Sequence, residues 1–126
     1  SQFVSVKDDK DTKNNVTLNG KLTLGENTAD NGGLRIAYMA LEDTLGDQPR
    51  KKIDDFTPEQ RLFLGWGQIW CQKLRPEYAR MLAKVDPHSP GKFRVNGVVG
   101  NMPEFVKAYS CKQNDAMVRP NACRVW

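Results

Sequence analysis

The amino-acid sequence predicts a mainly helical protein with irregular loops and little strand. Apolar residues recur at three- and four-residue steps through residues 26–45, as on one face of an amphipathic helix. Two helix-start signals that contain proline follow, at residues 57–60 and 75–78. The alternation typical of a strand is confined to a few residues near the N-terminus. With 126 residues, the chain is long enough for one domain and too short for two.

Residues 1–20 are expected to form an irregular lead-in to the first helix. Val4 and Val6 alternate with polar residues as in a short strand. Segment 7–15 is charged and Asn-rich like an exposed loop, and Asn19-Gly20 is a turn signal. No basic stretch followed by an apolar core opens the sequence, so we expect no signal peptide in it. No run reaches the roughly 18 apolar residues of a membrane-spanning helix.

The segment from Glu26 to about Leu45 has the periodicity of a helix. Its apolar face is formed by six residues: Ala29, Leu34, Ala37, Tyr38, Leu41 and Leu45. Gly32-Gly33 lies inside this pattern, where each glycine costs roughly 1 kcal/mol relative to alanine. We therefore expect either a close approach of another backbone there or a kink. Residues 46–56 are predicted to be a polar connector.

The next helices are predicted from their start signals. Thr57-Pro58-Glu59-Gln60 combines an N-cap threonine, a proline at the first helical position and a glutamine three residues after the cap. This helix should run to about Cys71, and its Gly65-Trp66-Gly67 patch predicts tight packing against another element. A further helix should start at Arg75-Pro76.

The remaining third of the chain is predicted to be largely irregular. Segment 86–101 is rich in proline and glycine, so we expect no regular helix there. Residues 103–109 should form a short helix that begins at proline. The tail, residues 110–126, should be an irregular wrap, in which burial of Trp126 would require a tether such as Cys123.

The charge pattern argues against a nucleic-acid partner. The formal net charge is +4 and the pI is about 9.1, but basic and acidic residues are interleaved and no five like charges stand together. A mixed, solvated surface is the favoured interpretation. The competing hypothesis, a basic nucleic-acid-binding domain, would require binding that depends steeply on salt.

Three cysteines are present, an odd number, and none has the spacing of a zinc knuckle. Cys111 and Cys123 could pair within the chain, which would leave Cys71 over. In an oxidising compartment an odd cysteine implies a partner outside the chain. The cysteine count therefore indicates that this chain is part of something larger.

Glu26 and Asp30 form the first candidate site. They are four residues apart on the expected helix, so both carboxylates project from one face. Acidic residues in a first helical turn also interact favourably with the helix dipole, which is the purely structural interpretation. The functional interpretation is that Glu26 is a metal ligand and Asp30 a carboxylate that orients another ligand.

A second candidate site surrounds the single histidine. His88 lies between two prolines, six residues before Arg94, in a glycine-rich segment. A rigid imidazole and a guanidinium could polarise or anchor a carbonyl or carboxylate, although a lone histidine in a loop is often only solvated. Ile69 and Trp70 form a third candidate, as the wall of a pocket or, alternatively, as ordinary core residues.

No autonomous catalytic motif is present in the sequence. HExxH, GxSxG, GxGxxG and the Walker loop are all missing. A catalytic zinc site needs about three protein ligands and an open position, which one histidine and one glutamate do not supply. Taken alone, this chain is not expected to be a working enzyme.

The motifs together resemble the C-terminal part of the neprilysin family of zinc metallopeptidases, which includes the endothelin-converting enzymes. The resemblance covers residue 18 to the C-terminus. It rests on LNG at 18–20, LGENTADNGG at 24–33, IWC at 69–71, RPEYA at 75–79, DPHSPGKFR at 86–94 and CRVW at 123–126. Thr28 stands where animal members commonly have isoleucine, which points to a bacterial member. Segment 7–15 does not align with the family.

The resemblance implies a fold and a zinc site. Residues 1–126 would be the C-terminal part of a thermolysin-like (gluzincin) catalytic domain, with the HExxH helix upstream of residue 1. Glu26 would be the third protein ligand to zinc. Asp30 would hydrogen-bond a zinc-bound histidine, and His88 would donate a hydrogen bond to the oxyanion that forms at the scissile carbonyl.

The resemblance also implies how a peptide substrate is bound. Arg94 would bind a substrate carbonyl, Ile69 and Trp70 would line an apolar pocket, and Arg124 is a weaker candidate for a peptide contact. The whole protein would hydrolyse peptide bonds with a metal-activated water. The competing hypothesis from another class is a non-catalytic peptide-binding or structural module that retains the family core.

Partners and location follow from the same resemblance. Members of the family are secreted, periplasmic or membrane-anchored, so we expect this protein outside the cytoplasm. Cys71, Cys111 and Cys123 would pair with cysteines in the missing N-terminal part of the same protein. That part and peptide substrates are the expected partners. The fragment alone should bind no zinc and should self-associate through apolar surface that the missing part covers.

Overall fold

The computed structural model of the chain describes residues 5–6 and 16–125. The mainly helical class with little strand is confirmed in these residues. The elements are β1 (Ser5–Val6), β2 (Val16–Thr17), α1 (Leu24–Leu45), α2 (Pro58–Ile69), α3 (Pro76–Val85), α4 (Gly91–Val99) and α5 (Pro103–Ala108). The two strands pair antiparallel, with Val6 opposite Val16. The expectations for Val4, segment 7–15 and Trp126 fall outside the described residues.

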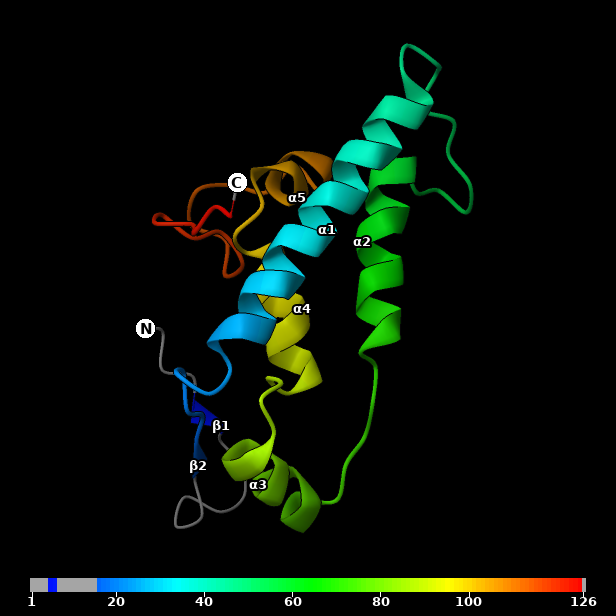
Figure 1. The fold of residues 1–126 in the computed structure, drawn as a ribbon. Coiled ribbons are helices and arrows are strands. Elements are labelled where there is room, and N and C mark those ends of the chain that lie inside the picture. Colours follow the sequence, from blue (N-terminus) through cyan, green and yellow to red (C-terminus); the bar gives the residue numbers. More distant parts are fainter. Residues whose placement is uncertain (1–4, 7–15, 126) are drawn as a thin grey trace.

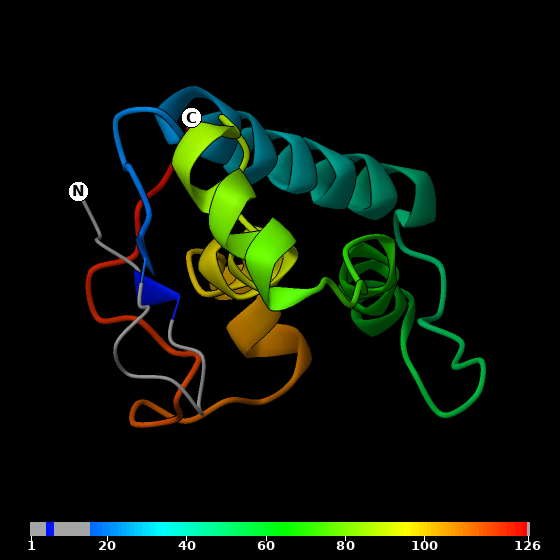
Figure 2. The same cartoon turned by 90° about the horizontal axis from the view of Figure 1, so that it is seen from below.

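Helix α4 lies at the centre of the helical arrangement. It packs against α1 and α2, and α2 also packs against both α1 and α5. In Figure 1, α1 and α2 run side by side along the length of the molecule. Figure 2 shows α4 between α1 and α5, while α3 lies at the end of the molecule, beside the β1–β2 ribbon. The loop between α3 and α4 therefore reaches the first turns of α1.

A small aromatic and aliphatic core joins these helices. Its buried members are Leu34 from α1, Phe63 from α2, Val98 and Val99 from α4, and Met102. Phe63 is at its centre: its ring stacks on Tyr38 at 5.9 Å between centroids and meets Phe105 edge-on at 5.4 Å. Such pairs stabilise a core beyond their buried area. The core fixes α4 against α1, which sets the position of everything α4 carries.

The two helix starts predicted at residues 57–60 and 75–78 are both observed. The Thr57 hydroxyl accepts a hydrogen bond from the Gln60 backbone N–H, and the Gln60 side chain accepts one from the Thr57 backbone N–H. This is the reciprocal pair of a capping box. Helix α2 ends two residues before the predicted Cys71. The Asn19 side chain accepts hydrogen bonds from the backbone N–H groups of Lys21 and Leu22, which forms the predicted turn.

The prediction for segment 86–101 is wrong in its second half, because α4 occupies Gly91–Val99. Pro90 sits at the N-cap, where its missing N–H would have no partner within the helix in any case. The C-terminal residues Val98 and Val99 are buried in the core. Their burial offsets the helix-propensity cost of Gly97, because tertiary packing outweighs intrinsic propensity.

The close backbone approach expected at the helical glycines is not observed at Gly33, Gly65 or Gly67, whereas Gly32 is buried. A Cβ added at Gly33, Gly65 or Gly67 would meet no atom of the described chain within 4 Å. Helix α1 runs without a break through Gly32 and Gly33. The tight contact is at Gly91, where a Cβ would lie 2.6 Å from the Trp70 carbonyl oxygen. Glycine is therefore required where α4 begins against the end of α2.

The cysteines form no disulfide with one another. Cys71 and Cys123 are exposed and Cys111 is half-buried, and all three are free. The pairing of Cys111 with Cys123, left open by the sequence, is not formed. In the part of the chain that the structure describes, the helices are too short or too polar to cross a membrane.

Candidate functional site

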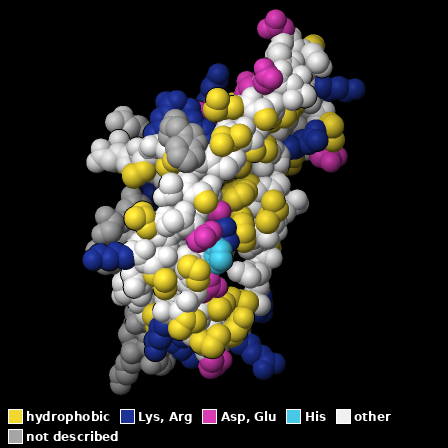
Figure 3. All heavy atoms as spheres, viewed as in Figure 1, with side chains coloured by type: hydrophobic (Ala, Val, Ile, Leu, Met, Phe, Trp, Pro, Cys, Tyr) yellow, Lys and Arg dark blue, Asp and Glu magenta, His cyan; other side chains and the backbone are white. Residues whose placement is uncertain are grey.

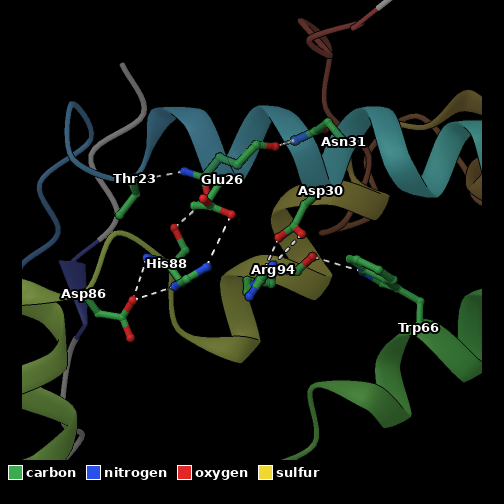
Figure 4. A network of polar contacts seen from close by, with 10 residues as sticks. Thr23, Glu26, Asp30, Asn31, Trp66, Asp86, His88 and Arg94 are labelled. Atoms are coloured by element: carbon green, nitrogen blue, oxygen red, sulfur yellow. Dashed lines mark hydrogen bonds and ion pairs between the residues drawn. The ribbon is translucent and has the colours of Figure 1, made fainter.

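Glu26 and His88 meet at the surface between α1 and the loop that precedes α4 (Figure 4). Glu26 lies in the first turn of α1, and His88 is 62 positions further along the chain. The Glu26 Oε2 and His88 Nε2 atoms are 3.3 Å apart, and the two side chains are 43% and 45% exposed. In the space-filling view, the single histidine is visible at the surface beside acidic and basic side chains (Figure 3). A substrate or a metal ion could therefore reach both groups.

Asp86 orients the imidazole of His88. Its Oδ1 accepts a hydrogen bond from the His88 backbone N–H at 2.8 Å and contacts the ring Nδ1 at 2.7 Å. These two bonds from His88, the backbone bond first, lower the pKa of the Asp86 carboxyl below its ordinary value. Because Nδ1 is held by Asp86, Nε2 is the nitrogen presented to Glu26. This role of Asp86 was not predicted, although an aspartate two residues before its partner is the signal of an Asx turn.

Asp30 and Arg94 form a buried, bidentate ion pair behind this surface. Arg94 Nε and Nη2 donate to the two carboxylate oxygens of Asp30, each at 2.6 Å. Their side chains are only 8% and 13% exposed. The hydrogen bonds to Asp30, more than any other cause, raise the pKa of Arg94. This pair links α1 to α4 and was not predicted, because 64 residues separate its members.

Two tryptophans hold Arg94 from the α2 side. The Trp66 indole N–H donates to the Arg94 backbone carbonyl at 3.1 Å. The Arg94 guanidinium carbon lies 3.6 Å from the centroid of the Trp70 ring, a cation–π contact. The Trp70 ring meets Trp66 edge-on at 5.6 Å, and its buried indole N–H has no hydrogen-bond partner in the described chain. Arg94 is thus fixed between a carboxylate and an aromatic face.

The remaining predicted site residues are not brought into this cluster. Ile69 is 68% exposed at the end of α2. Arg124 is exposed on the C-terminal tail and makes no hydrogen bond or ion pair with the described site residues. The tail itself is attached one residue earlier, where the Cys123 backbone N–H donates to the Asn101 side chain at 3.1 Å. The roles of both residues in substrate binding stay predictions.

The donor set fits a metal ion only in part. Glu26 offers a partly exposed carboxylate whose one polar side-chain contact within residues 5–6 and 16–125 is His88, and carboxylate oxygen is a zinc ligand. Asp30 already uses both oxygens on Arg94. Each of those oxygens keeps a further lone pair that could accept a bond from a ligating histidine. No group of three or more histidine, cysteine, aspartate or glutamate side chains in the described ranges could hold a metal ion. A zinc centre at Glu26 therefore needs donors beyond these residues.

Comparison with known families gives a match over almost the whole chain. The model of peptidase family M13 matches residues 1–125. The expectation that segment 7–15 does not align with the family is therefore wrong, because the match includes it. Human neprilysin is 45% identical over 112 residues, which are 86% of this chain and 15% of that protein. Human endothelin-converting enzyme 1 is 40% identical over 116 residues, 90% of this chain and 15% of that protein.

Solved structures agree with these matches. The open state of the Mycobacterium tuberculosis zinc metalloprotease Zmp1 superposes with a TM-score of 0.86 at 41% identity, over 93% of this chain and 18% of that chain. The same metalloprotease in complex with an inhibitor gives a TM-score of 0.81 at 43% identity, over 86% of this chain and 17% of that chain. This chain thus spans less than a fifth of the length of these relatives.

Proposed function

Because this chain belongs to peptidase family M13, we propose that it is the C-terminal part of the catalytic domain of a zinc metallopeptidase. The observation that carries the proposal is the juxtaposition of Glu26 and His88 at the surface, with the Asp30–Arg94 pair buried behind them. One carboxylate is available to a metal and one imidazole stands beside it. This arrangement suits the hydrolysis of a peptide bond at a metal centre.

Glu26 is the residue that would hold zinc from this chain. When bound, zinc would supply a Lewis acid that makes water a nucleophile near neutral pH. Asp30 does not compete for the metal, because Arg94 engages both of its oxygens. Its remaining lone pairs can accept the N–H of a ligating histidine from the rest of the protein.

His88 and Arg94 act on the substrate in this proposal. His88 donates a hydrogen bond to the oxyanion that develops at the scissile carbonyl, and Asp86 fixes the ring for that task. Arg94 binds Asp30 through Nε and Nη2, which leaves the N–H groups of Nη1 for a substrate carbonyl. Because the Asp30 pair and the Trp70 ring hold the guanidinium in place, binding a carbonyl costs little further conformational freedom.

The apolar and terminal residues have supporting roles. We assign Ile69 and Trp70 to the wall of the pocket that accepts the residue after the cleaved bond, and Arg124 to a contact with the peptide. Ile69 is suited to such a wall because its side chain is exposed rather than used in the core. The Trp70 ring is held in place by the Arg94 guanidinium, which lies 3.6 Å from its centroid.

The rest of the same protein is the proposed partner of the exposed apolar side chains. Apolar groups reach the surface over α1, α2 and α3 (Figure 3). The large apolar side chains that are more than half exposed are Leu24, Ile36, Met39, Ile69 and Val85 on these helices, and Ile53 in the connector between α1 and α2. Cover by the missing part would remove them from water, and the isolated chain would self-associate through them. An extracytoplasmic location, where Cys71, Cys111 and Cys123 could form disulfides with that part, completes the proposal.

The test compares variants of the complete protein that contains this chain, by zinc content and peptide hydrolysis. Glu26→Ala should remove zinc and activity together. His88→Ala should lower kcat by about 10²-fold or more, as for loss of an oxyanion donor, and leave zinc in place. Glu77→Ala, which removes an exposed carboxylate on α3, is the matched control and should change neither.

Two outcomes would contradict the proposal. Full zinc occupancy in Glu26→Ala would refute the ligand role. A wild-type protein that binds peptides but contains no zinc and cleaves nothing would instead favour the non-catalytic module.

A further inference from the structure

A second contact lies beside the Glu26–His88 pair and joins the two residues that follow them in the sequence. The Ser89 hydroxyl donates to the Asn27 side-chain oxygen at 2.7 Å. Two consecutive residues of α1 therefore meet two consecutive residues of the loop. The pairs differ in their surroundings: Glu26 and His88 are nearly half exposed, whereas Ser89 is only 7% exposed.

The buried contact continues as a relay into the segment before α1. The Asn27 side-chain N–H donates to the Thr23 hydroxyl at 3.2 Å, and that hydroxyl donates to the Asn19 backbone carbonyl at 3.2 Å. Thr23 is 3% exposed. It is labelled in Figure 4, where a dashed line marks the hydrogen bond that it accepts from the Asn27 side chain. Every donor in the relay points the same way, from Ser89 to Asn19. Asparagine suits the middle position because its amide accepts and donates at once.

These two contacts are the only hydrogen bonds or ion pairs between α1 and residues 86–90 in the described chain. The bonds from His88 to Asp86 lie within the loop and do not attach it to the helix. If Glu26 binds a metal and His88 turns to a substrate, the Glu26–His88 contact is lost. Among the described residues, the Asn27–Ser89 bond is then the one polar contact that remains between α1 and residues 86–90.

We propose that Asn27 and Ser89 are positioning residues, which keep His88 beside Glu26 when Glu26 is bound to a metal. The inference rests on the proposed function and assigns separate roles to the two pairs of residues. The exposed pair performs the chemistry, and the buried pair maintains the spacing between its members. A displacement of about 1 Å at a reacting group can reduce a rate by roughly 10²-fold, so this spacing matters to catalysis.

The experiment uses the complete protein, with zinc content, kcat and KM measured for three variants. Ser89→Ala removes the hydroxyl and should lower kcat about tenfold, with zinc content and KM near wild type. Ser89→Thr retains a hydroxyl and should recover kcat to within about twofold. Thr28→Ala removes a hydroxyl on the same turn that only bonds the Leu24 carbonyl, and should have no effect.

A mutant cycle separates positioning from a general loss of structure. In a His88→Ala background, Ser89→Ala should leave the residual kcat unchanged, because the hydroxyl acts only through His88. A further tenfold loss there would overturn the inference, as would a normal kcat in Ser89→Ala alone. If wild-type protein itself lacks zinc or peptidase activity, the proposed function fails instead.

Crystal structures provide a readout that does not depend on activity. With zinc bound, the wild-type protein should retain the Ser89–Asn27 hydrogen bond, and the backbone of residues 86–90 should move away from α1 only in Ser89→Ala. A zinc-loaded wild-type structure in which Ser89 and Asn27 have separated would overturn the inference, even if the enzyme is active.

Discussion

Replacing Gly91 with alanine should destabilise the protein, because there is no room for a methyl group where α4 begins. An added Cβ would lie 2.6 Å from the Trp70 carbonyl oxygen, whereas ordinary contact starts at 3.4 Å. The end of α2 and the start of α4 must therefore separate by about 0.8 Å. The opposing atom is a backbone oxygen, so no side-chain rotation can relieve the overlap.

The expected cost is about 1–2 kcal/mol. Overpacking of this kind typically costs roughly 1–3 kcal/mol, and alanine returns up to about 1 kcal/mol of helix propensity. For a chain of 126 residues this corresponds to a fall in Tm of about 3–8 °C. Trp70 supplies the opposing oxygen, and its ring contacts Arg94 of α4, so the cation–π contact should weaken as well.

Gly97→Ala is the matched control on the same helix. A Cβ at Gly97 meets no atom of the described chain within 4 Å, so alanine should be neutral or should stabilise α4 by up to about 1 kcal/mol. Thermal unfolding followed by far-UV circular dichroism compares the two variants with the parent chain. Equal stabilities for both variants, or a Gly91→Ala variant as stable as the parent, would refute the packing argument.

Two further predictions concern local interactions. The hydrogen bonds from His88 hold the pKa of Asp86 below its ordinary 3.8, so their stabilisation is present above that pH and is lost as the pH falls below it. Urea unfolding between pH 2.5 and 5 should show this acid loss of stability, and a slope just as steep in Asp86→Asn would contradict it. Thr57→Ala removes one half of the capping box and should cost about 1 kcal/mol. Thr44→Ala, which removes an exposed hydroxyl bonded within α1, should cost much less by the same assay, and equal losses would argue against the cap.

The sequence predicted those helices whose first residues contain a capping or proline signal. The capping box at Thr57 and the proline of α3 act within one turn, so the sequence contains all of the information needed to place them. Helix α4 escaped prediction because its glycines oppose a helix locally. What favours α4 is the burial of Val98 and Val99 against residues far away in the chain. Tertiary contacts of this kind leave no periodic trace in a segment of nine residues.

The candidate site was predicted as a set of residues rather than as a set of contacts. Glu26 and Asp30 were expected on one helical face, yet Glu26 is exposed and Asp30 is buried against Arg94. The resemblance to a family gave Asp30 and Arg94 separate tasks, and the ion pair between them became visible only in three dimensions. Ser89 was not predicted as a site residue, because a serine between prolines forms no distinctive sequence pattern. Only its burial and its hydrogen bond to Asn27 distinguish it.

The polar residues at the start of α1 divide their tasks by position. Glu26 and Asp30, one turn apart, face the histidine loop and Arg94. Asn27 and Asn31, also one turn apart, instead accept bonds from segments that carry site residues: Ser89 donates to Asn27, and the Asn101 side chain donates to Asn31 at 2.9 Å. Asn101 in turn accepts the backbone N–H that precedes Arg124 in the tail. One stripe of α1 thus presents the acidic groups, while the adjacent stripe anchors the loop and the tail through neutral amides. A neutral amide accepts these hydrogen bonds without adding a charge near the proposed metal ligand Glu26. An aspartate at position 27 or 31 would add a negative charge there.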